Sequence, residues 1–564
     1  MKGTLEVGDS KTGCFARLCS RSAGRTVNSL LLWRASLILL LLAVPITPVG
    51  AHQPLPKIIS ENGHHALLVD GKPYLVLGGQ VQNSSNYAAM LPLVWPTMQH
   101  LNANTVEMPV AWEQIEPIEG KFDFTFVDTL VRQARQNKLR ISLLWFGTWK
   151  NMAPTYVPEW VKTDRQRFPR LIGPDGQSRL GLSPFGRATL EADRRAFSQL
   201  MNHLRRTDPE HTVIMVQVEN EVGTLGTSRD FSPEAQRLFN ASVPPILRHA
   251  LNRESGNWSQ VFGALADQAF NAWYIARYTD EVAAAGKMVL DLPMYCNAAL
   301  SNPFHEAGAD KVASGGPNWN VIPLWKAAAP HIDFIAPDIY SRDHDIYITY
   351  LDDYTRPDNA LMVPETGNAL EFARFFWPAL GHGAIGFAPF GMDGTNYSNY
   401  PLGAQKVDAE TFEAFANLYR LFAPIAREWS RIALEKPTWG VAKDNIGADQ
   451  STTFGRWKVT AQFGLWQSKE RDDPRLQPNP NAARPVGGAV VAQLRPDEFL
   501  VAGNDVRIRF SSVNGENMEF LSVEEGTFRS GKWVMRRRWN GDQTDFGLNF
   551  VEPVLLKVRL DEFR

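Results

Sequence analysis

Short apolar runs recur between longer amphipathic stretches from about residue 55 to residue 400. The runs are rich in β-branched and aromatic residues, and the stretches between them carry apolar residues at helical spacing. Such alternation is typical of a parallel sheet built from repeated βα units. Eight units over a segment of this length predict an α/β fold, namely a (β/α)8 TIM barrel over residues 55–430. The expected strands are 74–79, 105–111, 140–146, 213–218, 288–294, 334–339, 361–364 and 384–389.

The pattern changes after about residue 435. Apolar and polar residues then alternate in short runs separated by Gly, Asn and Asp, which is typical of antiparallel strands. We therefore predict a smaller C-terminal antiparallel β domain over residues 431–564, with a loop or insertion at 471–485. Its expected strands are 453–462, 487–494, 498–501, 506–511, 532–537 and 553–560.

The first 51 residues have the pattern of a signal peptide. A basic segment ends at Arg34, the apolar run 35–46 follows, and small residues at 49–51 favour cleavage. Because a membrane-spanning helix needs about 20 apolar residues, no stable membrane insertion is expected. We predict an exported protein that is periplasmic or secreted.

Charge and cysteine content limit the classes of partner and cofactor. The formal net charge is −2, and the first 34 residues hold six basic but only two acidic residues. The rest of the chain is therefore net acidic and has no basic footprint for nucleic acid. Cys14 and Cys19 lie in the predicted signal and Cys296 stands alone, so no disulfide framework is expected. The histidines lack the spacing of metal ligands, and neither metal nor cofactor is predicted.

Candidate catalytic groups lie at the ends of two predicted strands, where the active site of a barrel is built. The fourth predicted strand is followed directly by Glu219, Asn220 and Glu221, and the seventh is followed directly by Glu365. A retaining glycosidase needs two carboxyl groups about 5 to 5.5 Å apart, one as proton donor and one as nucleophile. An amide at Asn220 can bond the sugar 2-hydroxyl. Strand alternation places Glu219 and Glu221 on the same face, so spacing alone leaves both open as the acid.

A longer set of residues resembles one known family. The string QVENEVG at 217–223 is similar to the acid/base motif of glycoside hydrolase family 35, the β-galactosidase family. NTVE at 104–107 and GKFDF at 120–124 match the family in the same order. The resemblance covers about residues 70–395.

The resemblance implies that Glu221 is the general acid/base, Glu365 the nucleophile and Asn220 a partner of the sugar 2-hydroxyl. The chain departs from the main family at several positions, among them Pro109, where the family has tyrosine. The segment 78–85 and the C-terminal β domain are similar instead to a divergent bacterial branch. That branch includes enzymes that remove β-galactose from xyloglucan side chains.

Other candidate substrate-binding residues follow from sugar chemistry, since rings stack on aromatic faces and polar groups bond hydroxyls. A tyrosine, either Tyr295 or Tyr340, can also hydrogen-bond the nucleophile. Asn83 and Asn151, at the ends of the first and third strands, can bind hydroxyls, although turns use asparagine equally. The candidate aromatic platforms are Trp145, Trp149, Tyr295 and Tyr340.

These features predict an exported, retaining exo-β-glycosidase that acts on an oligosaccharide or polysaccharide by double displacement. The leading hypothesis is a β-galactosidase that trims terminal galactose from plant oligosaccharides or xyloglucan side chains. One alternative is a relative with another sugar specificity, such as a β-glucosidase, β-mannanase or arabinosidase. A second alternative is a carbohydrate-binding barrel without catalysis.

Overall fold

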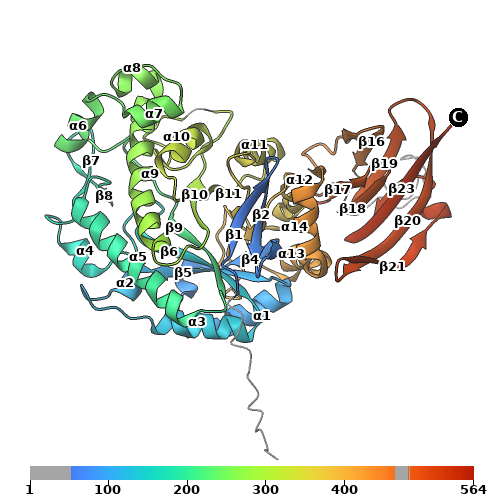
Figure 1. Cartoon of the computed structure of the whole chain (residues 1–564), viewed down its shortest axis with the longest axis horizontal. Helices are drawn as coiled ribbons and strands as arrows, with labels where there is room; N and C mark the ends of the chain where they lie inside the picture. Colours follow the sequence, from blue (N-terminus) through green and yellow to red (C-terminus); the bar gives the residue numbers. More distant parts are fainter. Residues whose placement is uncertain (1–52, 306, 464–480, 482) are drawn as a thin grey trace, which may run out of the picture. The chain divides into compact units, whose positions relative to one another are not determined.

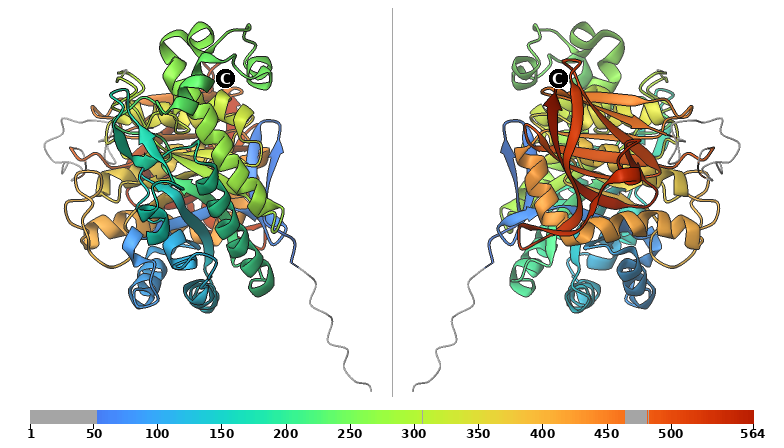
Figure 2. Two further views of the ribbon diagram at one scale, coloured as in Figure 1. Left: turned by 90° about the vertical axis from the view of Figure 1, so that its left-hand side faces the viewer. Right: turned by 90° about the vertical axis from the view of Figure 1, so that its right-hand side faces the viewer.

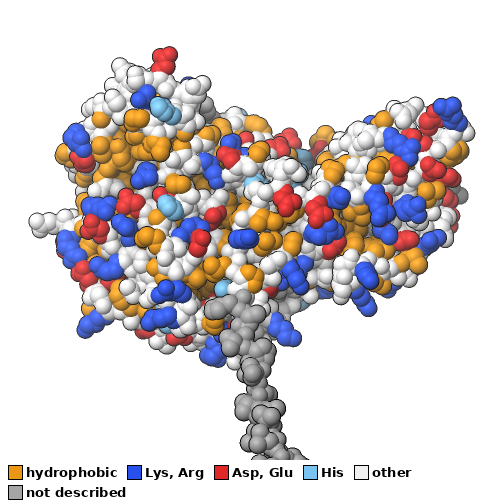
Figure 3. Space-filling view, in the orientation of Figure 1, with side chains coloured by type: hydrophobic (Ala, Val, Ile, Leu, Met, Phe, Trp, Pro, Cys, Tyr) orange, Lys and Arg blue, Asp and Glu red, His pale blue; other side chains and the backbone are white. Residues whose placement is uncertain are grey.

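A computed structural model describes residues 53–305, 307–463, 481 and 483–564. The predicted signal peptide and most of the predicted loop at 471–485 lie outside these residues. None of the described helices is both long enough and apolar enough to cross a lipid bilayer. On the face in Figure 3, Lys and Arg side chains are interspersed with Asp and Glu.

Eight parallel strands close into a barrel, in which the last strand pairs back to the first. The TIM barrel predicted from the sequence is therefore confirmed. In barrel order the strands are β4 (Val76–Gln80), β5 (Thr105–Ala111), β6 (Arg140–Lys150), β9 (Val213–Asn220), β10 (Met294–Ala299), β11 (Phe334–Ile339), β12 (Val363–Thr366) and β13 (Gly386–Pro389).

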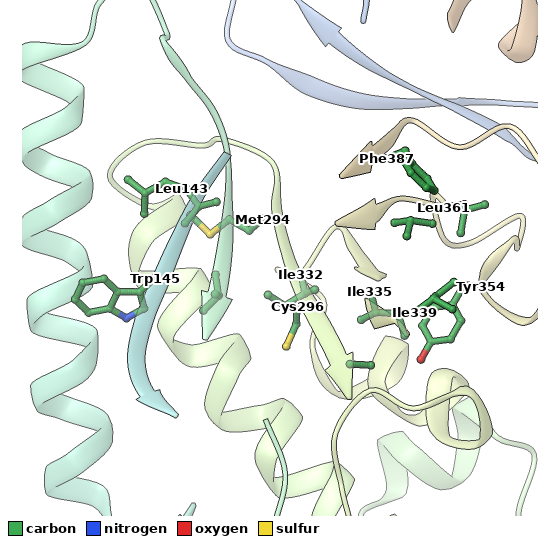
Figure 4. Packing of buried hydrophobic residues seen from close by; sticks show 14 of the residues in the cluster. Leu143, Trp145, Met294, Cys296, Ile332, Ile335, Ile339, Tyr354, Leu361 and Phe387 are labelled. Carbon is green, nitrogen blue, oxygen red and sulfur yellow. The ribbon is translucent and has the colours of Figure 1, made fainter. Parts of the chain in front are cut away.

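Helices cover the outside of this barrel, and two long ones, α5 and α9, lie side by side (Figures 1 and 2). Outward-facing strand residues such as Leu143 and Met294 pack in the layer between strands and helices (Figure 4). The helices are α1 (Leu91–Leu101), α2 (Trp112–Ile115), α3 (Thr125–Gln136), α4 (Glu159–Thr163), α5 (Arg187–Thr207), α6 (Pro233–Asn240), α7 (Pro245–Ala250), α8 (Trp258–Phe262), α9 (Ala266–Lys287), α10 (Ile322–Ala328), α11 (His344–Tyr354), α12 (Phe376–Gly381), α13 (Ala409–Phe422) and α14 (Ala426–Glu435).

The fifth barrel strand lies later in the chain than the sequence predicted. The apolar run 288–294 was expected to form it, but β10 begins only at Met294. Helix α9 extends to Lys287, and Met288, its C-cap, is 79% exposed. The run is therefore a connector, and a short apolar run cannot by itself be told from a strand.

Short elements fill the segments between barrel strands. A three-stranded antiparallel sheet precedes the barrel, a hairpin follows α4, and α6 to α8 lie between β9 and β10. The strands outside the barrel in this part of the chain are β1 (Lys57–Glu61), β2 (His64–Val69), β3 (Lys72–Tyr74), β7 (Arg170–Ile172) and β8 (Ser178–Leu182).

The C-terminal part is an antiparallel β domain, as predicted, and it consists of two sheets with a shared apolar core that includes Val459, Val491, Phe499 and Ile508. The six-stranded sheet contains β14 (Thr438–Ala442), β17 (Gly488–Arg495), β18 (Glu498–Asn504), β23 (Val554–Phe563), β20 (Asn517–Arg529) and β21 (Lys532–Trp539). The four-stranded sheet contains β15 (Gln450–Phe454), β16 (Trp457–Gln462), β19 (Val506–Ser512) and β22 (Leu548–Phe550).

Barrel and sheets meet where α12 packs on β14 and β17. A Cβ atom on Gly381 would lie 2.0 Å from the backbone nitrogen of Gly440, so only glycine permits this approach. Trp377 Nε1 donates a hydrogen bond of 2.8 Å to Asn504 Oδ1 across the same junction. The junction is therefore closely packed and specifically bonded.

Candidate active site

The ends of the barrel strands surround a cavity of about 450 Å³, and both predicted catalytic glutamates, Glu221 and Glu365, line it. A larger cavity of about 940 Å³, lined by parts of α11 and β14, holds none of the predicted site residues. The smaller cavity is therefore the candidate active site because of the residues that line it, and not because of its volume. Its other lining residues are Asn83, Lys150, Asn151, Ala299, Leu300, Asn302, Asp338, Tyr340, Ser341, Ile346, Tyr350, Phe390, Asn399 and Leu402.

Glu221 directly follows β9, the fourth barrel strand, and Glu365 lies in β12, the seventh. One carboxylate oxygen from each, together with one from Asp338, lie within 4.8 Å of one another. Retaining glycosidases place their two carboxyl groups about 5 to 5.5 Å apart, and inverting enzymes place them about 6.5 to 9.5 Å apart. The spacing of Glu221 and Glu365 is therefore suited to double displacement.

The backbone at the end of β9 decides between Glu219 and Glu221. Both residues have positive φ, +65° and +44° respectively, which breaks the alternation of side chains along the strand. Glu221 consequently lines the cavity, whereas Glu219 is fully buried and its Oε2 accepts a hydrogen bond of 2.7 Å from the Trp149 amide. The expectation that both glutamates share a face is wrong for this reason.

Two donors hold the carboxylate of Glu365. Tyr340 Oη donates to Oε1 at 2.5 Å, and Gln80 Nε2 donates to Oε2 at 2.9 Å. Hydrogen bonds to a carboxylate stabilise its charge. Glu365 is thus oriented, with one donor on each oxygen.

Glu221 has the opposite environment. Burial, followed by the negative charge of Glu365, raises its pKa to about 7, while Lys150 and a hydrogen bond with Asp338 act in the lowering direction. A carboxyl group with such a pKa is substantially protonated at neutral pH. The pair therefore contains one group suited to give a proton and one suited to attack.

Asp338 is a third carboxyl group in the cavity, and Asn297 links it to Glu221. Asn297 Nδ2 donates to Asp338 Oδ2 at 2.6 Å, and its Oδ1 accepts from the Glu221 amide at 2.9 Å. Burial, then Glu365 and Glu221, raise the pKa of Asp338 well above its ordinary value.

Among the described residues, Glu221, Asp338 and Glu365 form the one carboxylate, His or Cys group close enough to hold a metal ion. The raised pKa values of Glu221 and Asp338 mean that protons compete for the same oxygens. This donor set fits a proton-transfer site better than a resident cation.

Lys150 supplies a cation to this acidic cavity. Its side chain is only slightly exposed, its Nζ donates to Asn151 Oδ1, and the ammonium lies 5.4 Å from the centre of the Phe146 ring. Its positive charge favours the ionised forms of Glu221 and Asp338.

Glu107 lies inside the barrel and does not line the cavity. Neither of its carboxylate oxygens has a hydrogen-bond partner within the described chain. Burial, and then Glu365, raise its pKa well above the ordinary value. Burial and the nearby Glu365 carboxylate therefore favour the neutral form of Glu107.

Three of the predicted substrate-binding residues, Asn83, Asn151 and Tyr340, line the cavity. A fourth, Asn220, adjoins Glu221 in the chain but is not among the lining residues. Asn220, next to Glu221, is buried, and neither its Oδ1 nor its Nδ2 has a partner in the described chain. An amide left in this state is able to bind a ligand hydroxyl without giving up another bond.

The expectation that Trp145, Trp149 and Tyr295 stack on a sugar is not supported, because all three are buried away from the cavity. Trp145 faces the helix layer, packs on Phe197 and bonds Asp193 through Nε1 (Figure 4). Strand β6 extends to Lys150, so both tryptophans lie within the strand, and Trp149 packs on Tyr278.

Tyr295 lies within β10 instead of after it, because the strand begins at Met294. Its ring stacks on Phe334 at 5.0 Å, and its hydroxyl lies 3.2 Å from Ser142 Oγ inside the barrel. Of the two tyrosines considered as partners of the nucleophile, Tyr340 makes the bond to Glu365.

Sequence reasoning missed Gln80, Lys150, Asn297 and Phe390 as site residues. Gln80, Lys150 and Phe390 lie at or just beyond the end of a barrel strand, so exact strand ends would have found them. Asn297 lies within β10, two residues before its end, and no strand-end argument points to it.

Part of the chain is similar to known proteins. Residues 94–283 match a family model described as beta-galactosidase, of glycoside hydrolase family 42. This segment is β-galactosidase-like. It contains Glu221 but ends before Glu365, and residues 415–551 match a model described as a domain of unknown function.

A β-galactosidase of Xanthomonas manihotis is 26% identical over 178 residues, which cover 30% of this chain and 27% of that protein. The chain thus aligns with about a quarter of its relative's length. Among solved structures, the β-galactosidase of Bacillus circulans sp. alkalophilus has a TM-score of 0.46 at 12% identity, over 63% of this chain and 57% of that one. The cold-adapted β-galactosidase of Rahnella sp. R3 has a TM-score of 0.46 at 16% identity, over 66% and 59%.

Proposed function

We propose that the protein is a retaining exo-β-glycosidase, and specifically a β-galactosidase that removes terminal β-galactose from plant oligosaccharides or xyloglucan side chains. The observation that carries this proposal is the Glu221–Glu365 pair, whose oxygens lie within 4.8 Å in one cavity. The β-galactosidase-like segment 94–283 supports the choice of galactose.

In the first step of the proposed reaction, Glu221 gives its proton to the glycosidic oxygen as the bond from that oxygen to the anomeric carbon breaks. Glu365 attacks the same carbon, so that a covalent glycosyl–enzyme ester forms. In the second step, Glu221 takes a proton from water, which attacks the anomeric carbon and releases both the sugar and Glu365.

Each carboxyl group has the environment that its step requires. Glu221 is held partly protonated by burial and by Glu365. Once Glu365 becomes an ester, its charge is gone, the pKa of Glu221 falls, and Glu221 can act as the base. Asn220, whose side-chain amide atoms have no partner among the described residues, is the proposed partner of the sugar 2-hydroxyl.

A panel of 4-nitrophenyl glycosides tests the activity and the sugar. Hydrolysis of the β-galactoside above the β-glucoside, β-mannoside and α-arabinoside is expected, with loss of at least about 1,000-fold in kcat for Glu365→Gln. No hydrolysis by wild type above background would favour a barrel that only binds carbohydrate, and equal hydrolysis by wild type and Glu365→Gln would contradict Glu365 as the nucleophile. Proton NMR of the first product should show the β-anomer, and an α-anomer would contradict retention.

Export is a separate part of the proposal and rests on the signal-like pattern of residues 1–51. Expression in a bacterial host followed by fractionation should recover the protein outside the cytoplasm. N-terminal sequencing of that material should begin close to residue 52, and an intact cytoplasmic chain would contradict export.

A further inference from the structure

Two acidic side chains meet in a buried space just behind the strand end that carries Glu221. Glu219 lies on β9 and Asp193 on α5, and both are fully buried. A Cβ atom on Gly147 would lie 2.7 Å from Glu219 Oε1 and 2.8 Å from Asp193 Oδ2, so both oxygens crowd one glycine. Two ionised carboxylates cannot both persist at such close range in a buried space, and one of them must hold a proton.

The hydrogen bonds show which group holds it. Asp193 accepts from Trp145 Nε1 at 2.9 Å, from the Thr148 amide at 3.0 Å and from Thr148 Oγ1 at 2.6 Å. Three donors suit an ionised carboxylate. Asp193 is therefore the acceptor of the pair.

Glu219 has a different set of partners. Its Oε2 accepts from the Trp149 amide at 2.7 Å, while Oε1 has no other partner in the described chain. A proton on Oε1, donated to Asp193, satisfies this atom. Burial and the charge of Asp193 raise the pKa of Glu219 well above its ordinary value, in agreement with this assignment.

The turn after Glu219 needs such support. Glu219 and Glu221 both have positive φ, a backbone conformation that is strained for a residue other than glycine, so surrounding contacts must hold it. The amides of Asn151 and Met152 bond the carbonyls of Asn220 and Glu221 at 3.2 and 3.1 Å. Asn151 and Met152 directly follow β6, and Glu219 adds a side-chain hydrogen bond to β6 itself through the Trp149 amide.

We propose that Glu219 is a positioning residue, whose carboxylic acid joins Asp193 to β6 and holds the turn that aims Glu221 into the cavity. This inference rests on the proposed glycosidase function of Glu221. It gives Glu219 a task distinct from proton transfer to substrate. It also accounts for Gly147, since any side chain there would separate the two carboxyl groups.

The test compares Glu219→Gln and Glu219→Ala in the full chain. The glutamine amide can donate to Asp193 and its carbonyl can accept from Trp149, so kcat should stay within about 3-fold of wild type. Alanine removes both bonds, and displacement of Glu221 should lower kcat about 100-fold while KM changes little. The alkaline limb of kcat/KM should move to lower pH in Glu219→Ala, because Glu221 would lie farther from Glu365 and nearer to solvent.

Glu116→Gln is the matched control. Glu116 is also fully buried, but it bonds Arg195, Trp112 and the Gly120 amide instead of the β9 turn. This variant should lose thermal stability and keep the wild-type kcat and pH limb. An equal shift of the limb in Glu116→Gln would overturn the proposal, and so would an equal loss of kcat in Glu219→Gln and Glu219→Ala, or wild-type behaviour of Glu219→Ala.

One measurement does not need activity. The infrared difference spectrum of wild type minus Glu219→Gln at about pH 8, where an ordinary carboxyl group is ionised, should show the loss of one protonated-carboxyl component, while the absorption of other buried acids such as Glu107 remains. A protonated-carboxyl absorption of equal intensity in the two proteins would contradict the proton on Glu219. A wild-type chain that hydrolyses no glycoside would instead contradict the proposed function. The infrared result would still show whether the carboxyl group of Glu219 is protonated.

Discussion

The hydroxyl of Tyr340 donates a hydrogen bond of 2.5 Å to Oε1 of Glu365. Tyr340 follows β11 and Glu365 lies in the neighbouring strand β12, so two adjacent strand ends fix the bond. The orientation of the proposed nucleophile therefore depends on the barrel itself and not on a mobile loop.

Tyr340→Phe should lower kcat about 10- to 100-fold, because a hydrogen bond to a charged group contributes about 1.5–3 kcal/mol. Tyr347→Phe is the control, since the Tyr347 hydroxyl is buried nearby but contacts Thr366 Oγ1 at 3.2 Å. Steady-state kinetics on an aryl galactoside measure the difference. Similar losses of kcat in both variants would show that the hydrogen bond to Glu365 contributes no more to catalysis than the Tyr347 contact with Thr366.

The pH profile of kcat/KM should have an alkaline limb near pH 7, because Glu221, with its pKa raised to about 7, must carry a proton to act as acid. Activity is thus present below this pH and is lost above it. Lys150→Met removes a charge that favours ionised Glu221, so the limb should move to higher pH. Lys162→Met, which removes an exposed partner of Glu113, should leave the limb in place.

Glu107→Gln should change how stability depends on pH. The pKa of Glu107 is raised well above 4.5 in the folded chain, so between these values the folded state binds the proton that the unfolded state has released. The free energy of unfolding therefore falls as pH rises through this window.

A neutral amide at position 107 removes that loss. The melting temperature of Glu107→Gln should consequently decrease less than that of wild type between about pH 5 and pH 8. Glu254→Gln, at an exposed position, is the control and should follow wild type. Parallel melting curves for Glu107→Gln and wild type would contradict the assignment.

Asn220→Ala should lower kcat/KM on a β-galactoside by about 100-fold, because the amide is proposed to bond the 2-hydroxyl as charge develops. The same substitution should cost much less on a 2-deoxy-β-galactoside, which lacks that hydroxyl. An equal loss on both substrates would indicate damage to Glu221 instead of a lost sugar contact.

The barrel and most of its strands were predictable because their apolar runs are bounded by clear turn and helix signals. The connector before β10 was not, since the residues 288–294 are as apolar as a strand while α9 ends at Lys287. That displacement also moved Tyr295 from the expected rim into the barrel interior. A shift of a few residues in a strand end is enough to change a predicted ligand contact into core packing.

At the site, the positions of Glu221 and Glu365 followed from the strand ends, and so did Tyr340. The separate positions of Glu219 and Glu221 did not, because two left-handed backbone conformations overturn the simple alternation of a strand. Trp149 was misplaced because β6 continues to Lys150, and its ring packs on Tyr278 of α9. Trp145 lies within the expected strand, but its side chain points outward to Asp193 and Phe197 of α5. The positive φ angles of Glu219 and Glu221 could not be predicted from the types of these residues.

The contact between Gly381 and Gly440 has a consequence for attempts to shorten the chain. Helix α12 connects the strand that carries Glu365 to the last barrel strand, and its outer surface is covered by β14 and β17. Excision of the C-terminal sheets would leave that surface, including Trp377, facing water. We therefore expect the catalytic barrel to be insoluble when expressed without its partner, and the minimal active fragment to extend to the C-terminal strand β23.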